Sequence, residues 1–489
     1  MTDNPLLHRP QPLFIDGAWR APEDPHPIAA VDPSSGQTLA EVAGAGPADV
    51  TAAVTAAHGA FPGWRRMPAG GRGAYLSAFA EGLRKRAPEL VDLQMRNSGK
   101  PRAEAEIDVG DAVVTFDYYA GLANDLEARE GSPVALPDAG FEGKTRFEPL
   151  GVAAMIVPWN FPLVTSAWKI APALAAGCTV VLKTSEYTPL IELAYGDMAL
   201  EAGLPPGVLN LLTGAGVTGA AMTRDPRVGK LSFTGSNAVG SKVMAAAAAR
   251  CIPVSLELGG KSPIVVFEDA DLDLAADCVA AGIFFNCGQM CSATSRLLVH
   301  DRVAGELLDR LVERARALKV GSPFEEATEM GPQTTRPQYE KVLECFGRAK
   351  AEGAACLAGG EPLQRGGGFF VAPTLYADVP TDSFLWHEEI FGPVLAARTF
   401  KNEAEAVELA NDSAYGLVAT VVSQDVARAE RVAAQIEAGH IWINSPQVIF
   451  PQTAWGGFKA SGIGRELGPW GLNAFLGVKH ISLRRSGPP

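Results

Sequence analysis

The sequence predicts an α/β protein with two doubly wound domains. From about residue 145 onward, short apolar runs that end in turn signals alternate with alanine-rich helical stretches. Such strand–helix–strand repetition is typical of parallel sheets covered by helices on both faces. The 489 residues are enough for two or three domains with sizeable cores.

The predicted strands fall into two sets. The first set comprises 152–157, 179–182, 208–212, 230–233 and 264–267, with helices at 190–202 and 239–249. The second set follows Asp271 and comprises strands after about residue 370 and the runs 394–400, 419–422 and 441–443, with a helix at 426–438. Before both sets, Asp16-Gly17 between short apolar runs predicts a hairpin turn. The segment 127–147 lacks helical periodicity and predicts β-strands outside both cores.

Composition disfavours several functional classes. Hydrophobic residues make up 47% and charged residues 20% of the chain, as in ordinary globular enzymes. The formal net charge of −13 argues against a nucleic-acid partner, which requires a basic surface. The N-terminus lacks a basic segment followed by an apolar run, and the apolar stretch at 170–182 is too short to span a bilayer. We therefore expect a cytoplasmic protein without a membrane partner.

The cysteines predict a nucleophile and no metal. Seven are scattered at positions 178, 251, 278, 287, 291, 345 and 356, which gives neither a disulfide framework nor a zinc spacing. No histidine stands near Cys287 and Cys291. Cys291 and Glu257 are the candidates for chemistry, because a thiol that attacks a carbonyl and a carboxylate that activates water are the two halves of covalent acyl chemistry.

Two glycine-rich segments look like nucleotide-binding loops. Gly214-Ala215-Gly216-Val217-Thr218-Gly219 follows a predicted strand but lacks the acidic residue expected about 20 positions later. The segment 235–242 nearly matches a P-loop, but its lysine does not follow the second glycine, which excludes nucleotide hydrolysis. A strand, glycine turn and helix at 234–240 can still hold a pyrophosphate on N-terminal amides.

Lys183 and Glu186 are candidates for ribose binding. They lie just past the predicted strand 179–182, where open α/β sheets bind ligands. A lysine and a carboxylate there can hydrogen-bond ribose hydroxyls, and Glu186 would repel a 2′-phosphate. An ordinary solvated ion pair has the same sequence pattern.

Seven short motifs occur in one order along nearly the whole chain. They are Pro158-Trp159-Asn160-Phe161-Pro162, Lys183-Thr184-Ser185-Glu186, Phe233-Thr234-Gly235-Ser236, Glu257-Leu258-Gly259-Gly260-Lys261, Gly288-Gln289-Met290-Cys291, Glu389-Ile390-Phe391-Gly392-Pro393 and Ser461-Gly462-Ile463-Gly464-Arg465-Glu466. Together they resemble the NAD(P)-dependent aldehyde dehydrogenase superfamily. One motif alone would be weak support, whereas seven in register are specific.

The resemblance implies two Rossmann-like domains and a small β oligomerisation flap. We place the NAD-binding domain at 1–126 and 148–258, the catalytic domain at 259–467 and the flap at 127–147 and 468–489. The resemblance further implies NAD as the cofactor, with NADP as the alternative, and a homo-oligomer that is either a dimer or a homotetramer.

The resemblance assigns catalytic roles to five residues. Cys291 attacks the aldehyde as a thiolate, and the side-chain amide of Asn160 and the backbone N–H of Cys291 hold the oxyanion. Glu257 deprotonates the water that hydrolyses the thioester. Lys169 and Glu466 match positions proposed to relay that proton, although a helix lysine and a salt-bridged glutamate have the same sequence pattern.

The resemblance also places the cofactor loop at 233–240. The residues expected to bind NAD are Trp159, Lys183, Glu186, Gly214, Phe233, Gly235, Ser236, Glu389 and Phe391. In this assignment Gly214 lies near the adenine, Glu389 holds the nicotinamide ribose and Phe391 positions the nicotinamide.

Within the superfamily, the chain most resembles the betaine-aldehyde and aminoaldehyde branch, through 282–297 and 454–472. The implied substrate residues are Phe161, Trp168, Phe285 and Trp455 as an aromatic box, Asp108 and Asp111 at the tunnel mouth, and His440. Aromatic faces attract ammonium groups, and the two acids would steer a cation inward. The box position that is often tryptophan is Phe285 here, and His440 replaces a small or aliphatic residue, which disfavours betaine aldehyde.

We therefore predict NAD-dependent oxidation of an ω-aminoaldehyde or betaine-type aldehyde to the acid, through a cysteine thiohemiacetal and thioester. An apolar tunnel for aliphatic or aromatic aldehydes is the nearest alternative. Glu257 argues against a CoA-acylating dehydrogenase, and the intact Cys291, Glu257 and Asn160 argue against a non-catalytic structural member. Cys287 is expected to be a bystander that could form a reversible disulfide with Cys291 under oxidation.

Overall fold

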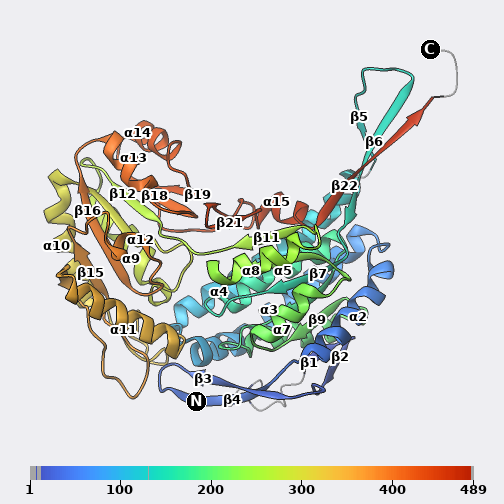
Figure 1. Cartoon of the computed structure of the whole chain (residues 1–489), viewed down its shortest axis with the longest axis horizontal. Helices are drawn as coiled ribbons and strands as arrows, with labels where there is room; N and C mark the ends of the chain where they lie inside the picture. Colours follow the sequence, from blue (N-terminus) through green and yellow to red (C-terminus); the bar gives the residue numbers. More distant parts are fainter. Residues whose placement is uncertain (1–6, 8–12, 130, 486–489) are drawn as a thin grey trace.

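Two sheets built mainly of parallel strands organise the molecule (Figure 1). The computed structural model describes residue 7 and the ranges 13–129 and 131–485. The first sheet has the order β2-β1-β9-β8-β7-β10-β11-β21. Its strands are β1 (Leu13–Ile15), β2 (Ala18–Arg20), β7 (Val152–Ile156), β8 (Thr179–Lys183), β9 (Leu209–Leu212), β10 (Val228–Thr234), β11 (Val254–Glu257) and β21 (Gly462–Ile463). Neighbours from β9 to β11 are parallel, which confirms the predicted α/β class.

The central part of the first sheet is buried on both faces because adjacent residues of its inner strands pack into different cores. In β7, Ala153 and Met155 belong to one apolar cluster, whereas Val152 and Ala154 belong to another. The helices around these clusters are α2 (Pro47–Trp64), α3 (Ala69–Ser98), α4 (Arg102–Arg129), α5 (Pro162–Ala176), η1 (Ile191–Leu193), α6 (Ala194–Glu201), α7 (Gly216–Arg224) and α8 (Asn237–Ala248). Burial on both faces explains why these strands read as continuous apolar runs.

The second sheet has the order β14-β15-β16-β13-β12-β18-β19 around one core. Its strands are β12 (Pro263–Val266), β13 (Arg296–His300), β14 (Ala355–Ala358), β15 (Thr374–Ala377), β16 (Val394–Phe400), β18 (Val418–Val422) and β19 (His440–Ile443). Its helices are α9 (Leu272–Phe284), η2 (Phe285–Gly288), α10 (Asp301–Ala317), α11 (Arg336–Ala351), α12 (Phe384–His387), α13 (Glu403–Asn411) and α14 (Val426–Ala433). Only the edge strand β14 pairs antiparallel.

The predicted hairpin at Asp16-Gly17 is confirmed. The two residues have φ values of 56° and 72°, as a type I′ turn requires, and β1 pairs with β2 across them. Two further antiparallel pairs were not predicted. They are β3 (His26–Asp32) with β4 (Gln37–Gly44), and β17 (Tyr415–Gly416) with β20 (Phe458–Lys459).

A three-stranded sheet projects from the rest of the molecule (Figure 1). It consists of β5 (Ser132–Val134), β6 (Phe141–Pro149) and β22 (Leu476–Arg484). Its segments depart slightly from the ranges predicted for the flap. At the first range, α4 continues to Arg129. At the second, the helix α15 (Gly468–Asn473) precedes β22 and contacts α5. Likewise β21, from the range predicted for the catalytic domain, pairs with β11 of the first sheet. The division into domains stays a prediction.

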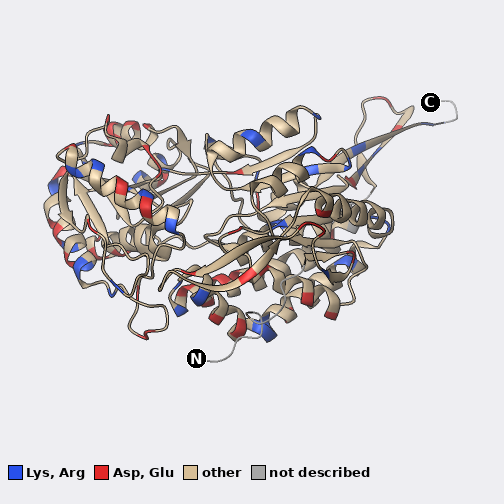
Figure 2. Cartoon of the chain, turned by 60° about the horizontal axis from the view of Figure 1, so that its bottom comes forward, with Lys and Arg blue, Asp and Glu red and all other residues tan. Residues whose placement is uncertain are grey.

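Acidic and basic residues are intermingled along the helices of both halves (Figure 2). Among the described residues, no helix combines the length and apolar character needed to cross a membrane. All seven cysteines are free thiols.

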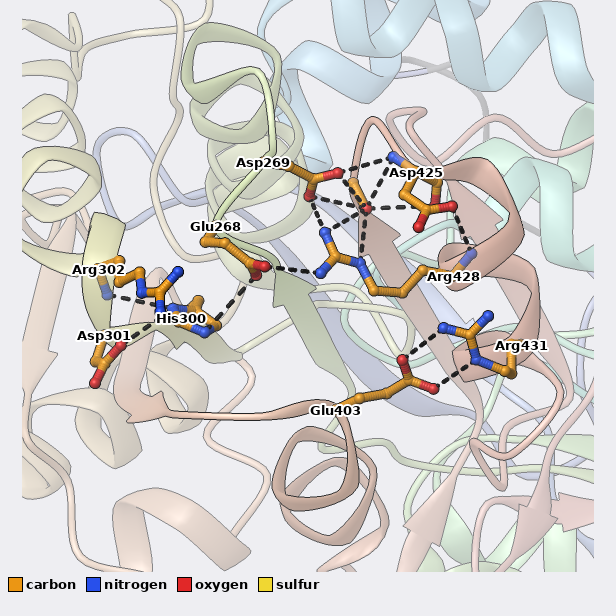
Figure 3. Close-up of polar contacts among 10 residues, drawn as sticks. Glu268, Asp269, His300, Asp301, Arg302, Glu403, Asp425, Arg428 and Arg431 are labelled. Atoms are coloured by element: carbon orange, nitrogen blue, oxygen red, sulfur yellow. Dashed lines mark hydrogen bonds and ion pairs between the residues drawn. The ribbon is translucent and has the colours of Figure 1, made fainter.

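A charged cluster lies at the carboxyl ends of β12 and β18 (Figure 3). Arg428 donates a hydrogen bond of 2.9 Å to Glu268 and forms an ion pair with Asp269. Ser423 also donates to Asp269, at 2.9 Å. Burial would raise the pKa of both carboxyl groups, but both pKa values lie below their usual range. The hydrogen bond from Arg428 lowers the pKa of Glu268. The backbone N–H of Asp425, the Ser423 hydroxyl and the charge of Arg428 lower the pKa of Asp269.

We expect Arg428→Ala to destabilise the protein by about 2 kcal/mol at pH 7, between the values for exposed and buried ion pairs. The substitution leaves two neighbouring carboxylates without their cation. Because the folded pKa values are lowered, this stabilisation is present above the ordinary carboxylate pKa of about 4 and is lost as the pH falls below it. Urea unfolding at pH 7 and at acid pH measures both effects.

Arg431→Ala is the matched control. Arg431 pairs with Glu403 at 2.7 Å in the same region, but its side chain is 55% exposed, against 16% for Arg428 (Figure 3). Solvent screens an exposed ion pair, so Arg431→Ala should change the free energy of unfolding much less than Arg428→Ala. Equal losses of stability in the two variants would contradict the assignment of the stabilisation to the half-buried cluster of Arg428, Glu268 and Asp269.

Candidate active site

One cavity of about 380 Å³ contains the three residues predicted to carry the chemistry, Cys291, Glu257 and Asn160. Its walls come from the turns after β7, β10 and β11 and from loops of the second sheet. The predicted site residues that line it are Asp108, Asp111, Trp159, Asn160, Phe161, Trp168, Gly235, Ser236, Glu257, Phe285, Cys291, Glu389, Phe391 and Trp455. The cavity therefore joins the predicted cofactor and substrate residues.

The first sheet delivers several of these residues because its parallel strands end at one edge. Glu257 is the last residue of β11, Thr234 ends β10 and Lys183 ends β8. The carboxyl ends of parallel strands are where doubly wound sheets bind ligands. The strand β11 was not predicted, although it is the element that holds Glu257.

Cys291 follows a short left-handed turn and lies partly exposed against Phe161 and Trp168. Burial, and then the charges of Glu257 and Glu389, raise the pKa of Cys291 to about 12. The thiol is therefore protonated at neutral pH in this arrangement. A base must take its proton before it can attack a carbonyl.

Asn160 precedes α5 and its side chain is buried beside the nucleophile loop. Its Nδ2 donates a hydrogen bond of 2.9 Å to the carbonyl of Gln289, two residues before Cys291. An amide NH₂ carries two hydrogens, so this bond leaves one donor for a substrate oxygen.

Glu257 is buried, and its Oε2 has no hydrogen-bond partner among the described residues. Burial, followed by the nearby charge of Glu466, raises its pKa well above the usual carboxylate value, while Lys169 and Arg465 oppose the shift. Lys169 and Glu466 form a buried ion pair. The structure thus brings Glu257 and the two residues predicted to relay its proton into one buried cluster.

The residues predicted to hold the adenosine half of NAD lie together beyond β8. Lys183 Nζ donates to the carbonyl of Gly214 at 2.6 Å and pairs with Glu186 at 3.3 Å. Gly214 itself packs closely, because a Cβ there would lie 2.1 Å from Thr218 Oγ1. The glycine-rich segment thus makes a tight turn into α7. The Gly214 carbonyl accepts a hydrogen bond from Lys183, the lysine predicted to bind ribose.

The turn from β10 into α8 forms a second part of the predicted cofactor site. Gly235 has a φ of 159°, and a Cβ added there would lie 2.7 Å from the Phe233 ring. Ser236 caps α8, a helix long enough to present N-terminal amides to a phosphate. A turn that only glycine can occupy, placed at a helix N-terminus, is suited to bind the pyrophosphate of a dinucleotide.

The nicotinamide half is predicted to lie near Glu389 and Phe391. Glu389 Oε1 accepts a hydrogen bond of 3.0 Å from the backbone N–H of Gly260. The rings of Phe391 and Trp159 meet edge to face, with centroids 5.4 Å apart. Both aromatic residues line the cavity, as does Cys291.

Four aromatic side chains form the predicted box. The rings of Phe161 and Phe285 are nearly parallel, at 9°, with centroids 6.4 Å apart. Trp168 and Trp455 meet at 62° with centroids 5.5 Å apart. All four line the cavity.

His440 differs from its predicted place. Its ring lies 4.5 Å from the Trp442 ring and 5.9 Å from the Trp455 ring, and it is not among the residues that line the cavity. It contacts Trp455, which does line the cavity. Burial lowers the pKa of His440, so the ring is neutral at neutral pH.

The two acids predicted at the tunnel mouth differ from each other. Asp108 is buried in an ion pair of 2.9 Å with Lys100, whose ammonium also lies 3.8 Å from the Phe161 ring centroid. The charge of Asp108 is therefore compensated inside the protein, contrary to expectation. Asp111 also lines the cavity, and burial, followed by Asp108, raises its pKa to about 6.

Lys100 was missed in the sequence because nothing local marks it. It follows Gly99 at the end of α3 and meets Asp108 only because α4 folds back beside it. Cys287 is buried, and its Sγ accepts a hydrogen bond of 3.1 Å from Gln333. Within the described part of the chain, no group of three or more His, Cys, Asp or Glu side chains could hold a metal ion.

Comparison with known proteins supplies independent information. A family model described as the aldehyde dehydrogenase family matches residues 19–481. The chain is 47% identical to a chloroplastic aminoaldehyde dehydrogenase of Arabidopsis thaliana, over 98% of this chain and 97% of the relative. It is 45% identical to a chloroplastic betaine aldehyde dehydrogenase of Beta vulgaris, over 98% and 97%. Its structure resembles that of a betaine aldehyde dehydrogenase of Staphylococcus aureus in complex with NAD+, with a TM-score of 0.95, 38% identity and coverage of 99% and 97%.

Proposed function

Since this chain belongs to the aldehyde dehydrogenase family and is an NAD-dependent oxidoreductase, we propose that it oxidises an ω-aminoaldehyde or betaine-type aldehyde to the acid at Cys291. One observation carries the proposal. A single cavity is lined by Cys291, Asn160 and Glu257, by four aromatic residues and by strand-end residues suited to a dinucleotide.

Cys291 passes its thiol proton to solvent water, and the thiolate sulfur then bonds to the carbonyl carbon of the aldehyde, whose C=O π electrons move onto oxygen to give the thiohemiacetal. The negative oxygen that develops is held by the side-chain amide of Asn160 and the backbone N–H of Cys291. One such donor typically contributes about 3 kcal/mol of transition-state stabilisation. The hydrogen bond from Asn160 to Gln289 fixes the amide before substrate arrives.

NAD, when bound, supplies the acceptor for the two electrons that turn the thiohemiacetal into a thioester. Lys183 and Glu186 are placed to hold the adenosine ribose, with Gly214 beside the adenine. The charge of Glu186 disfavours NADP, the alternative cofactor. Gly235 and Ser236 would bind the pyrophosphate, with Phe233 packed against Gly235, and Glu389 would hold the second ribose. Phe391 and Trp159 would form the wall beside the nicotinamide.

Glu257 then deprotonates the water that hydrolyses the thioester. Its raised pKa makes it a stronger base than an ordinary carboxylate once ionised. The buried Lys169–Glu466 pair lies beside it and is suited to carry the proton away. Release of the acid returns Cys291 to its starting state.

The aromatic box supports a cationic substrate. The rings of Phe161, Trp168, Phe285 and Trp455 line the same cavity as Cys291, and an aromatic face that is free to contact the substrate attracts an ammonium group by about 0.5–2 kcal/mol. Asp111 adds a carboxyl group to the same cavity. Relatives with 45–47% identity are named aminoaldehyde and betaine aldehyde dehydrogenases.

A substrate series tests this proposal. We expect kcat/KM to fall in the order 3-aminopropanal, betaine aldehyde, benzaldehyde, with at least a tenfold difference between the first and last, which corresponds to about 1.4 kcal/mol of cation binding. NADH absorbance measures the rates. A clear preference for benzaldehyde would favour the apolar tunnel instead, and formation of acyl-CoA without free acid would favour an acylating dehydrogenase.

We also propose that the protein is a homo-oligomer, a dimer or a homotetramer, in the cytoplasm. Along β22, Val478 is 71% and Leu483 58% exposed, an apolar strand surface that a second copy would cover. Free thiols at all seven cysteines suit a reducing compartment. Sedimentation velocity and imaging of the tagged protein test these two points.

A further inference from the structure

Glu104 is a buried acid that the proposed chemistry does not use. It lies in the first turn of α4, and its Oε1 accepts a hydrogen bond of 2.9 Å from the backbone N–H of Asn286. Its Oε2 has no partner among the described residues. A buried carboxylate with only one hydrogen bond destabilises the folded protein, because it loses its hydration without full compensation. Its presence here calls for a functional explanation of that one bond.

The backbone that Glu104 contacts is strained. Asn286 and Cys287 have φ values of 48° and 54°, and Gly288 follows with 72°. Each non-glycine residue in this left-handed region costs about 1–2 kcal/mol. Three consecutive left-handed residues persist only if surrounding contacts hold them. Cys291 lies three residues after Gly288, the last of the three.

The contacts that hold this turn lead directly to the proposed oxyanion donor. The side chain of Asn286 donates to the carbonyls of Asn160, at 3.1 Å, and Gln289, at 3.2 Å. The side chain of Asn160 donates to the same Gln289 carbonyl, at 2.9 Å. The orientation of the Asn160 amide is therefore tied to the position of Asn286, whose backbone N–H is bound by Glu104.

We propose that Glu104 is a positioning residue for aldehyde attack, which fixes the left-handed turn at Asn286 and thereby aligns both the Cys291 thiol and the Asn160 amide. The inference rests on the proposed roles of Cys291 and Asn160. Glu104 acts by holding the turn at Asn286, and not through the electrostatic effect of its charge on the Cys291 thiol. The carboxylates that raise the pKa of Cys291 are Glu257 and Glu389, whereas the charge of Glu104 raises that of Cys287.

The charge of Glu104 also makes this contact sensitive to pH. Burial raises its pKa to about 7, and the Asn286 N–H and the Lys100 ammonium oppose the shift. The other ionisable groups of this region are Cys287 in the turn and Asp108, which is paired with Lys100. Above about pH 7 the carboxylate makes a charge-assisted bond, which is stronger than the bond to the neutral acid below it.

Glu104→Met and Glu104→Gln test the proposal at saturating NAD. Methionine keeps the length of the side chain but its sulfur is only a weak hydrogen-bond acceptor, so we expect kcat/KM for the aldehyde to fall about 10²-fold, the effect of a misplacement of about 1 Å. Glutamine retains an acceptor and should keep most of the activity. The ratio of wild-type to Glu104→Gln kcat/KM should decrease as the pH falls through about 7. The Kd for NAD should not change.

Two comparisons separate positioning from a general loss of stability. Glu192→Gln is the control, because Glu192 is a buried acid whose two carboxyl oxygens have no hydrogen-bond partner among the described residues, and its charge acts on Lys183 and Asp108 and not on Cys287 of the turn. In a double-mutant cycle, the losses from Glu104→Met and Asn160→Ala should be less than additive, because both affect one arrangement. Unchanged kcat/KM in Glu104→Met, equal losses in both Glu104 variants, or additive losses with Asn160→Ala would overturn the inference. An inactive wild type would instead refute the proposed function.

Discussion

Replacement of Cys291 by alanine is expected to abolish NADH formation with every aldehyde, by at least about 10⁴-fold in kcat. The effect is this large because no covalent intermediate can form without the nucleophile, and the other groups of the site act only on that intermediate. NAD binding should survive, since the predicted adenosine-binding contacts of Lys183, Gly214 and Glu186 lie away from the thiol. NADH absorbance and calorimetric titration with NAD measure the two properties.

Cys287→Ala is the matched control for this substitution. Cys287 lies only four residues away, but it is buried and hydrogen-bonded to Gln333, which leaves it unable to replace the nucleophile. We expect the Cys287 variant to keep its activity and the Cys291 variant to lose it. Substantial NADH formation by Cys291→Ala would show that another group attacks the aldehyde, and the proposed mechanism would fail.

The elements that the sequence predicts well are those whose signal is local. The strand predicted at 179–182 is present as β8, which ends at Lys183, and the rule that ligands bind at the carboxyl ends of strands predicts a ligand contact there. The hairpin at Asp16-Gly17 follows from two residues that tolerate positive φ. The roles of Cys291, Glu257 and Asn160 came from the resemblance, because spacing alone does not say which distant residues meet.

The features that sequence reasoning missed depend on long-range contacts. The strand β11 is only four residues long and becomes a strand by pairing with β10. Asp108 looks like a free surface acid until α4 folds back and places it against Lys100. His440 lies behind Trp455 because β19 adds to the sheet edge beside β18. Glu104 and Asn286 are 182 residues apart, and no periodicity connects them.

Glu257→Gln is expected to separate the two halves of the reaction. The first turnover should still release about one NADH per active site, because Cys291 and Asn160 are intact. Steady-state turnover should then fall by about 10²–10⁴-fold, the usual contribution of a general base. The thioester accumulates since the amide cannot deprotonate water. Stopped-flow absorbance shows the burst, and intact-protein mass spectrometry shows the acyl group on the enzyme.

The pH dependence distinguishes this role of Glu257 from a purely structural one. Burial and Glu466 raise the pKa of Glu257, and a base acts only when deprotonated, so wild-type turnover should rise with pH through that raised pKa. The Gln variant should lose this rise. The ionised carboxylate is also disfavoured in the folded protein, so stability contributed by the neutral form decreases as the pH rises. The variant should therefore be no less stable than the wild type above neutral pH.

Hydroxylamine provides the decisive control for Glu257→Gln. It attacks a thioester without needing a general base, so it should release the stalled acyl group as a hydroxamic acid once the free aldehyde, with which it forms an oxime, has been removed. After the hydroxylamine is removed in turn, fresh aldehyde and NAD should give a second burst of NADH in the variant. Because Glu257 Oε2 has no protein partner among the described residues, the amide of glutamine disrupts no hydrogen bond there. If the variant shows normal steady-state turnover, or no burst even with hydroxylamine, the thioester is hydrolysed by another base or never forms.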